Sequence, residues 1–370
     1  MIYNWQQRDW PHFTYDIEEI EDNLFSLAEE SGLIMGMLNG MSKESQTETL
    51  VDIMVSEAIK TSEIEGEYMN RGDVVSSIRN NLGINKEPIK VKDKKASGIG
   101  SLMVDVRQTF MEPLTKEKLF QWHEMLMAGS RNIQVGVWRT HTEPMQIISG
   151  AAGKEKIHFE APPSSRVPQE MDRFIAWFNA TAPGGKKEIK KPSVRVAIAH
   201  LYFESIHPFE DGNGRIGRAI AEKALSQTLK RPVFLSLSKT IEAHKRAYYR
   251  ALETGQRGNH ITPWVKYFAE TTLLAQRQAR QLTDFVLKKT KFFDHFKDQL
   301  NDRQLKVVRR MFEAGPEGFE GGMNAAKYLS LTTSSKATAT RDLQNLVKMN
   351  IFITQGGGRS THYVLNLTGF

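Results

Sequence analysis

The 370 residues include no cysteine, and this absence removes several chemistries at once. Without a thiol the chain forms no disulfide and has no thiolate nucleophile. A zinc site would also lack its commonest ligand. Disulfide-stabilised folds and thiol enzymes are therefore excluded, and zinc-binding folds are disfavoured.

Long apolar runs are missing as well. No stretch approaches the roughly 18 apolar residues that a transmembrane helix needs. The start, MIYNWQQRDW, lacks the basic region and apolar run of a signal peptide. Hydrophobic residues at 40% and charged residues at 25% are ordinary for a globular protein, and the length allows two or three domains. We therefore expect a cytoplasmic protein without a membrane partner.

Net negative charge is absent too, because the chain carries a formal charge of +7. The excess is uneven: residues 271–370 hold 15 Lys and Arg against 8 Asp and Glu, which accounts for all of it. This asymmetry indicates that the C-terminal part meets an anionic partner.

The most informative stretch is HPFEDGNGRIGR, residues 207–218. On both sides, residues 192–206 and 215–229 repeat apolar positions with a period near 3.6, which predicts a helix, a tight loop and a second helix. Gly212 and Gly214 can adopt positive φ and turn backbone N–H groups inward. A helix N-terminus also attracts anions. The stretch therefore predicts a phosphate-binding loop.

Side chains of the same stretch add chemistry to the loop. Arg215 and Arg218 can hold phosphate oxygens in bidentate fashion. A carboxylate beside phosphates, here Asp211, suits Mg²⁺. His207 can accept a proton near neutral pH, and Phe209 is expected in the core. A simple turn would need neither both arginines nor the histidine, so we predict a phosphoryl or nucleotidyl transfer site.

The stretch resembles the signature of Fic domains, His-Pro-Phe-x-Asp/Asn-Gly-Asn-Gly-Arg-x-x-Arg, and matches every fixed position. The resemblance implies a mainly α fold, a Fic helical core with a β-hairpin flap. It also implies transfer of AMP from MgATP to a Tyr, Thr or Ser hydroxyl of a target protein, which can include the chain itself. The implied site comprises His207 as catalytic base, Asp211 as the Mg²⁺ ligand, and Gly212, Asn213, Gly214, Arg215 and Arg218 as ATP-phosphate ligands.

A second motif lies within KTSEIEGEYMN, residues 60–70. It resembles the inhibitory motif of Fic proteins, Ser/Thr-x-x-x-Glu-Gly/Asn, with Thr61, Glu65 and Gly66 at the fixed positions. A Glu65 carboxylate paired with Arg218 would occupy the guanidinium meant for the γ-phosphate and turn ATP from a productive pose. The alternative is an ordinary solvated acidic helix end. We expect the N-terminal helical region, residues 1–85, to inhibit the Fic core of residues 86–283.

Two short apolar runs, residues 145–148 and 157–159, flank a Gly-rich turn at 149–153 and predict a β-hairpin. The resemblance identifies it as the flap, which docks a target segment by main-chain pairing through Gln146, Ile147 and Ile148. A metal site at the nearby His141 and His158 is disfavoured, because no third ligand has matching spacing. Tyr248 or Tyr249 is expected beside the adenine. Arg139 is expected to support the fold, and Trp5 and Trp10 to pack against helices.

The last segment, residues 284–370, has its own pattern. Helices are predicted at 302–314, 323–331 and 335–349, followed by strands at 351–355 and 362–367 around a glycine turn. This order is typical of a winged helix. Two alternatives stay open: a protein-contact or dimerisation module, and a DNA-binding module. In the second, the groove-facing residues would be Ser335, Lys336, Thr338, Thr340 and Arg341, with Arg359 on the wing.

We therefore predict an autoinhibited protein adenylyltransferase. One alternative is the reverse reaction, removal of AMP, with Glu65 positioning a water. Another is a winged-helix DNA-binding regulator whose Fic core senses nucleotide. A homodimer follows only from the resemblance and stays open.

Overall fold

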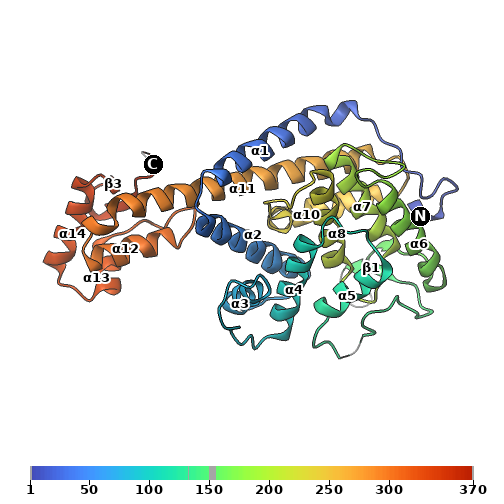
Figure 1. Cartoon of the computed structure of the whole chain (residues 1–370), viewed down its shortest axis with the longest axis horizontal. Coiled ribbons are helices and arrows are strands. Elements are labelled where there is room, and N and C mark those ends of the chain that lie inside the picture. Colours follow the sequence, from blue (N-terminus) through green and yellow to red (C-terminus); the bar gives the residue numbers. More distant parts are fainter. Residues whose placement is uncertain (1, 132, 150–155, 369–370) are drawn as a thin grey trace. The chain divides into compact units, whose positions relative to one another are not determined.

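The computed structural model of the chain describes residues 2–131, 133–149 and 156–368 (Figure 1). The chain divides into two compact units. The first comprises Met1–Gly32 and Leu50–Ala279, and the second Leu33–Thr49 and Arg280–Phe370. The divisions fall inside three helices, α1 (Glu21–Asn39), α2 (Lys43–Ile64) and α11 (Thr262–Phe296). Within the described ranges, none of the helices combines the length and apolarity that crossing a bilayer requires.

Two helices form the centre of the first unit, α7 (Pro192–Ile206) and α8 (Asn213–Thr228). Every residue of α7 after its first proline is buried. Its apolar side chains point in all directions, as expected for a helix surrounded by others. The proline itself stands at the first helical position, where its missing N–H costs nothing. The loop between α7 and α8 is thus fixed at both ends by buried helices.

The remaining helices of this unit surround that pair. Several begin with side-chain caps: Asn70 accepts a hydrogen bond from the amide of Asp73, and Thr115 from that of Lys118. Three short 3₁₀ turns, η1 (Asn4–Gln6), η2 (Glu18–Ile20) and η3 (Ser164–Arg166), join them. The surrounding helices are α3 (Arg71–Asn81), α4 (Lys94–Gln108), α5 (Lys116–Leu126), α6 (Val167–Ala180), α9 (Leu237–Ala243) and α10 (Lys245–Gly255).

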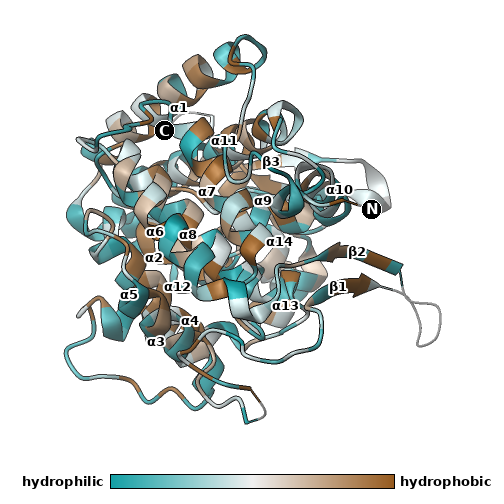
Figure 2. Ribbon diagram, turned by 90° about the vertical axis from the view of Figure 1, so that its right-hand side faces the viewer, coloured by the Kyte–Doolittle hydropathy of each residue, from teal (hydrophilic) through white to brown (hydrophobic). Residues whose placement is uncertain are grey.

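The predicted hairpin is present as β1 (Gln146–Ser149) and β2 (Lys156–Glu160), which pair antiparallel with a register shift between Ile147 and Ile148. Figure 2 colours much of both strands brown, which marks apolar residues. The predicted turn falls largely on residues 150–153, which lie outside the described residues. Trp5 donates its indole N–H to the Glu160 carbonyl at 2.7 Å. The N-terminal segment therefore braces the base of the hairpin.

The aromatic N-terminus packs as expected. Trp5 and Trp10 are 9% and 8% exposed. The Trp10 ring meets Phe13 and Tyr202 edge-on, at centroid distances of 5.5 and 5.1 Å. Its indole N–H donates to Glu170 Oε2 at 2.9 Å, which satisfies the one polar atom that burial would otherwise leave unpaired.

One helix crosses a predicted domain limit. Helix α11 continues to Phe296, because Phe285, Phe292 and Phe296 enter the second core. The predicted boundary at 283/284 thus lies inside α11, and the predicted domain limits stay predictions.

The second unit contains α12 (Asp302–Phe312), α13 (Ala325–Thr332) and α14 (Lys336–Lys348), then strands β3 (Phe352–Gln355) and β4 (His362–Leu365), with 3₁₀ turns η4 (Lys297–Gln299) and η5 (Gly358–Ser360). The strands pair antiparallel, and Met323 exchanges two backbone hydrogen bonds with Tyr363. Asp342 on α14 accepts from Arg303 and from the Tyr328 hydroxyl, each at 2.9 Å, and so links the three helices. The order of elements is that predicted for a winged helix.

Candidate active site

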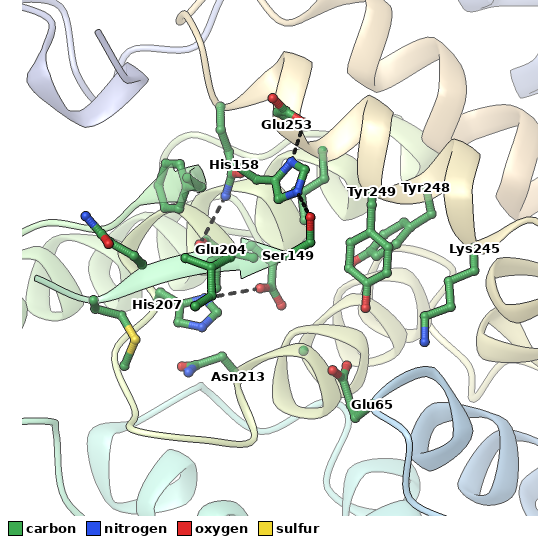
Figure 3. Close-up of a pocket in the computed structure, with 18 of the residues that line it drawn as sticks. Glu65, Ser149, His158, Glu204, His207, Asn213, Lys245, Tyr248, Tyr249 and Glu253 are labelled. Atoms are coloured by element: carbon green, nitrogen blue, oxygen red, sulfur yellow. Dashed lines mark hydrogen bonds and ion pairs between the residues drawn. The ribbon is translucent and has the colours of Figure 1, made fainter. Parts of the chain in front are cut away.

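A cavity of about 900 Å³ lies in the first unit (Figure 3). The end of α7, the loop after it, the start of α8, both hairpin strands and α10 contribute to its wall, and Glu65 closes one side. The residues of the wall that were predicted as site residues are Glu65, Gln146, Ile147, Ile148, His207, Asp211, Gly212, Asn213, Gly214, Arg218, Tyr248 and Tyr249.

The loop from α7 to α8 is shaped by two left-handed residues. His207 ends α7 with φ 50° and ψ 62°, and Gly212 starts α8 with φ 81°. A Cβ on Gly212 would come within 3.0 Å of Leu126 Cδ2, so the position needs glycine on both grounds. Asn213 closes the loop: its Oδ1 accepts from the Phe209 amide at 2.9 Å, and its Nδ2 donates to the Phe209 carbonyl at 2.8 Å. Both ends of that side chain therefore hold the loop closed.

A buried arginine supports the strained end of α7. Arg139 is 1% exposed, and its Nε donates to the His207 carbonyl at 2.8 Å. Its other nitrogens donate to the Pro162 carbonyl and to Ser164 Oγ. Burial lowers the pKa of Arg139 to about 10, so the group stays charged at neutral pH. As the sequence suggested, Arg139 serves the fold, and it holds His207 in a backbone conformation that otherwise costs about 1–2 kcal/mol.

His207 faces a carboxylate from its own helix. Its Nδ1 lies 3.5 Å from Oε2 of Glu204, whose side chain is 5% exposed (Figure 3). Burial acts to raise the pKa of Glu204, but the contact with His207 and the charge of Arg218 lower it overall. The carboxylate is therefore ionised. Sequence reasoning missed Glu204, because it sits inside an apolar helix without a motif.

Asp211 projects into the cavity and is the natural place for a cation. Its side chain is 55% exposed, and its Oδ1 accepts from the Gly212 amide at 2.5 Å. Mg²⁺ is commonly held by one or two carboxylates together with substrate phosphates, so a single carboxylate beside a phosphate loop fits it. Within the described ranges, three or more metal-ligating side chains do not gather anywhere. A site filled by protein ligands alone is therefore not present there.

A second buried histidine holds the backbone of Asp211. The His123 ring stacks on Phe209 with centroids 4.1 Å apart. The Gly136 amide donates to its Nδ1 at 2.9 Å, so Nε2 carries the proton and donates to the Asp211 carbonyl at 3.2 Å. Burial lowers the pKa of His123, which keeps the ring neutral. The sequence could place His123 only on a helix, since its partners lie far along the chain.

The structure brings Thr61 and Glu65 onto Arg218. Arg218 is buried; its Nε donates to Thr61 Oγ1 at 2.7 Å and its Nη2 to Glu65 Oε1 at 2.7 Å. Burial acts to lower the pKa of Arg218, but the charge of Glu65 raises it overall. A Cβ on Gly214 would lie 2.3 Å from Glu65 Oε1. The carboxylate thus rests directly on the glycine loop where a phosphate would lie.

Arg215 is placed differently from Arg218. It is not among the residues that line the cavity; its Nη1 donates to Glu67 and its Nη2 lies 3.5 Å from Asp211 Oδ1. Glu67 also accepts from Lys95 at 2.7 Å. Gly66, with φ 80°, turns the chain between Glu65 and Glu67 so that each reaches a different arginine. Glu67 carries no signal in the sequence beyond its place next to the inhibitory motif.

The hairpin and α10 close the opposite side of the cavity. His158 on β2 lies 3.0 Å from Glu253 Oε2 through Nδ1 and 2.6 Å from Ser149 Oγ through Nε2 (Figure 3). Tyr248 is buried and its hydroxyl lies 2.7 Å from His200 Nε2. Tyr249 is 38% exposed, and burial of its hydroxyl raises its pKa to about 12. Tyr249 is therefore the better placed of the two tyrosines to meet a nucleobase.

A helix-ending histidine, a glycine loop and an uncapped helix N-terminus share one cavity, and an uncapped helix N-terminus favours an anion. Residues 113–225 match the Fic/DOC family, so this part of the chain is a Fic domain. Residues 3–84 match a domain of unknown function, DUF4172.

Curated relatives and solved structures agree with this family. The chain is 24% identical over 212 residues to the protein adenylyltransferase Fic of Culex quinquefasciatus, covering 56% of the chain and 38% of the relative. It is 30% identical over 102 residues to that of Aedes aegypti, covering 28% and 18%. The chain thus spans well under half of these relatives.

Two bacterial crystal structures share the fold. A Fic family protein from Desulfovibrio desulfuricans aligns with 96% of this chain and 98% of its own, at a TM-score of 0.53 and 20% identity. A Fic domain containing signaling protein from Bacteroides thetaiotaomicron aligns with 72% and 97%, at a TM-score of 0.53 and 18% identity.

Proposed function

We propose that this chain is a protein adenylyltransferase that transfers AMP from MgATP to a Tyr, Thr or Ser hydroxyl of a target protein. The observation that carries the proposal is the shared cavity: His207, the start of α8 and the exposed edge of β1 all line it. A base, an anion site and a peptide-docking strand are the three parts that such a transfer requires. The names of the curated relatives support the same reaction.

The chemical step follows from this placement. His207 Nε2 accepts the proton of the acceptor hydroxyl, and the oxygen attacks the α-phosphorus of ATP. The bond between that phosphorus and the bridging oxygen to the β-phosphate breaks, and pyrophosphate leaves. The products are the AMP ester of the target, pyrophosphate and a protonated histidine. Positioning and charge stabilisation supply most of the rate in such transfers.

Binding of the phosphates falls to the backbone amides at the start of α8 and to Arg218, which of the two motif arginines is the one that lines the cavity. Asp211 would hold Mg²⁺, which when bound neutralises charge on the phosphates. Arg215 acts indirectly, because its side chain contacts Asp211 and Glu67 rather than the cavity.

Glu65 inhibits the enzyme in this proposal. Its carboxylate occupies Arg218 and lies against Gly214, so it competes with the γ-phosphate both for the guanidinium and for space. Thr61 holds the same guanidinium through its hydroxyl and its carbonyl, at 2.7 and 2.9 Å, which orients Arg218 toward Glu65. In this proposal the pairing of Glu65 with Arg218 is the resting state of the enzyme.

The test uses ATP labelled on the α-phosphate with wild type, Glu65→Gly, and Glu65→Gly combined with His207→Ala. We expect weak self-labelling of wild type and a rise of about 100-fold for Glu65→Gly, since about 3 kcal/mol is a usual value for a charge-assisted contact. His207→Ala should reduce labelling of Glu65→Gly about 10³-fold. Melting temperature and ATP binding serve as controls for folding. A folded Glu65→Gly variant that binds ATP but remains unlabelled, alone and with cell extract as target, would refute the proposal.

Removal of AMP is the second candidate, and one observation favours it: Glu65 lines the same cavity as His207 and Asp211. A carboxylate there can align a water for attack on an AMP ester. Incubating wild type with a target already labelled by Glu65→Gly separates the two. Release of AMP by wild type but not by Glu65→Gly would assign this activity, whereas a stable label would exclude it.

A further inference from the structure

Glu204 is a buried carboxylate to which the proposed reaction assigns no role. It lies one helical turn before His207 on α7, so both side chains share one helix face. Its Oε2 is 3.5 Å from His207 Nδ1, and its side chain is 5% exposed. Its other oxygen, Oε1, is buried and finds no hydrogen-bond partner among the described residues. Burying an ionised group in such a place costs free energy, so we expect Glu204 to have a function there.

The neighbouring helix is shaped around this carboxylate. A Cβ on Gly217 of α8 would lie 2.2 Å from Glu204 Oε1 and 3.2 Å from His200 Cε1. Gly217 lies inside a helix, where glycine costs about 1 kcal/mol relative to alanine. Its backbone is ordinary helix rather than left-handed, so the glycine provides space and not conformational freedom. Glu204 Oε1 occupies the space that the missing side chain of Gly217 leaves.

The contact determines which imidazole nitrogen carries a proton. A carboxylate beside Nδ1 favours the tautomer with hydrogen on Nδ1, which leaves Nε2 as the free lone pair. That nitrogen is the one that must take a proton from a hydroxyl in the cavity. After transfer, the ring is positively charged and the same carboxylate lies next to it. The geometry resembles other sites in which a base is oriented by a buried acid.

We infer that Glu204 is a positioning residue: it accepts the Nδ1 hydrogen of His207, fixes the tautomer that exposes Nε2, and stabilises the ring once protonated. The inference rests on the proposed transfer for its consequence in rate. Its structural content, the tautomer of His207, can be measured without any reaction.

The direct test is the ¹⁵N NMR signal of the His207 ring, assigned by its loss in His207→Ala. With Glu204 present, the ring should be mainly in the Nδ1–H form. In Glu204→Gln and Glu204→Ala it should move toward the Nε2–H form that prevails in water. Glu29→Gln, an exposed site on α1, removes the same charge far from the cavity and should leave the signal unchanged.

The kinetic test uses the Glu65→Gly background. Glu204→Gln should lower kcat about 10-fold and Glu204→Ala about 100-fold, the range seen when a residue behind a ligand or base is removed. The KM for ATP should stay within about twofold, because Glu204 does not reach the phosphates in this proposal. Melting curves exclude simple unfolding.

A second variant displaces the carboxylate without removing it. Gly217→Ala should push Glu204 away and lower kcat as Glu204→Gln does. Combined with Glu204→Ala, the extra methyl group meets no carboxylate, so the double variant should be no slower than Glu204→Ala alone.

An unchanged His207 signal in Glu204→Gln and Glu204→Ala would overturn the inference, whatever the rates do. Additive losses of kcat in the double variant would also overturn the inference, since Gly217 would then act independently of Glu204. If Glu65→Gly transfers no AMP, the proposed function fails, and the NMR result alone then decides the inference.

Discussion

The two units bury different kinds of side chain. The first encloses charged groups deep among its helices, including Arg139, Arg195, Arg218, Glu204 and Lys223. In the second, the described part of the buried core is mostly Phe, Leu, Val and Met, and Asp342 is its one buried charged residue.

The difference separates what each unit can do. Burying a charge costs several kcal/mol unless partners are arranged around it, so such groups persist where a fold or a reaction needs them. In the first unit Arg139 holds the carbonyl of the left-handed His207, and Arg195 and Lys223 donate to backbone carbonyls of neighbouring segments. The second unit has a plain apolar core. Single substitutions in each of the two units can test this contrast.

The largest effect is expected for Arg139→Met. The change leaves the carbonyls of His207 and Pro162 without a donor in a buried place. We expect a loss of about 2–6 kcal/mol in unfolding free energy of the first unit, measured by chemical denaturation, since each buried carbonyl left without a donor costs about 1–3 kcal/mol, and loss of AMP transfer. Arg173→Met, which removes an exposed guanidinium of α6, should cost less than about 1 kcal/mol. Equal losses of unfolding free energy in the two variants would show that the buried guanidinium of Arg139 does not stabilise the fold.

Leu346→Ala should have the next largest effect. Leu346 is fully buried in the second core, so truncation should cost about 2–4 kcal/mol. Because the core is separate, the loss should appear in one unfolding transition while self-labelling of Glu65→Gly stays within about twofold. A parallel loss of labelling would mean that the two units unfold as one.

Glu67→Gln tests whether the second ion pair adds to inhibition. Glu67 holds Arg215 and Lys95, and its loss should loosen the segment that carries Glu65. We expect wild-type self-labelling to rise about 10-fold, less than for Glu65→Gly, since about 1.4 kcal/mol corresponds to tenfold. In the Glu65→Gly background the same change should have little effect. A large further rise there would place Glu67 in direct control of Arg215.

Surface charge on α14 tests the second unit. Lys336, Thr340 and Arg341 are exposed, as a groove-reading helix requires, whereas the side chain of Arg359 lies outside the described residues. If this unit binds DNA, Lys336→Ala with Arg341→Ala should weaken binding of duplex DNA about 10-fold and reduce its salt dependence. Fluorescence anisotropy measures both. No binding by wild type at low salt would favour the protein-contact alternative.

The smallest effect is a pH dependence of stability from Glu222 on α8. Burial and the nearby charge of Glu57 raise the pKa of Glu222 from 4.5 to about 8. The neutral form is thus favoured on folding, so its stabilisation is complete below about 4.5 and is lost as pH rises through about 8. Glu222→Gln should match wild type near pH 5 and have a higher free energy of unfolding near pH 9, measured by chemical denaturation. Glu29→Gln should follow wild type at both values.

The sequence predicted those parts whose conformation depends on residues that are close together in the chain. The run from His207 to Arg218 carries its own loop and helix signals, and the hairpin strands alternate with a turn between them. The contacts of Glu67, His123, Arg139 and Glu204 depend on partners far along the chain or on which face of a helix is buried. For the same reason the sequence grouped Arg215 with Arg218, although one side chain lines the cavity and the other does not.

The left-handed glycine at position 66 has a consequence for how this protein tolerates mutation. Its surroundings are open, so a side chain would fit there without a clash. A non-glycine residue would adopt the φ of 80° only at a cost of about 1 kcal/mol in conformational free energy. Under the proposed inhibition, a single replacement at position 66 would therefore weaken two ion pairs together while every acidic group stays in place, and it would raise activity without any change to the proposed nucleotide-binding residues.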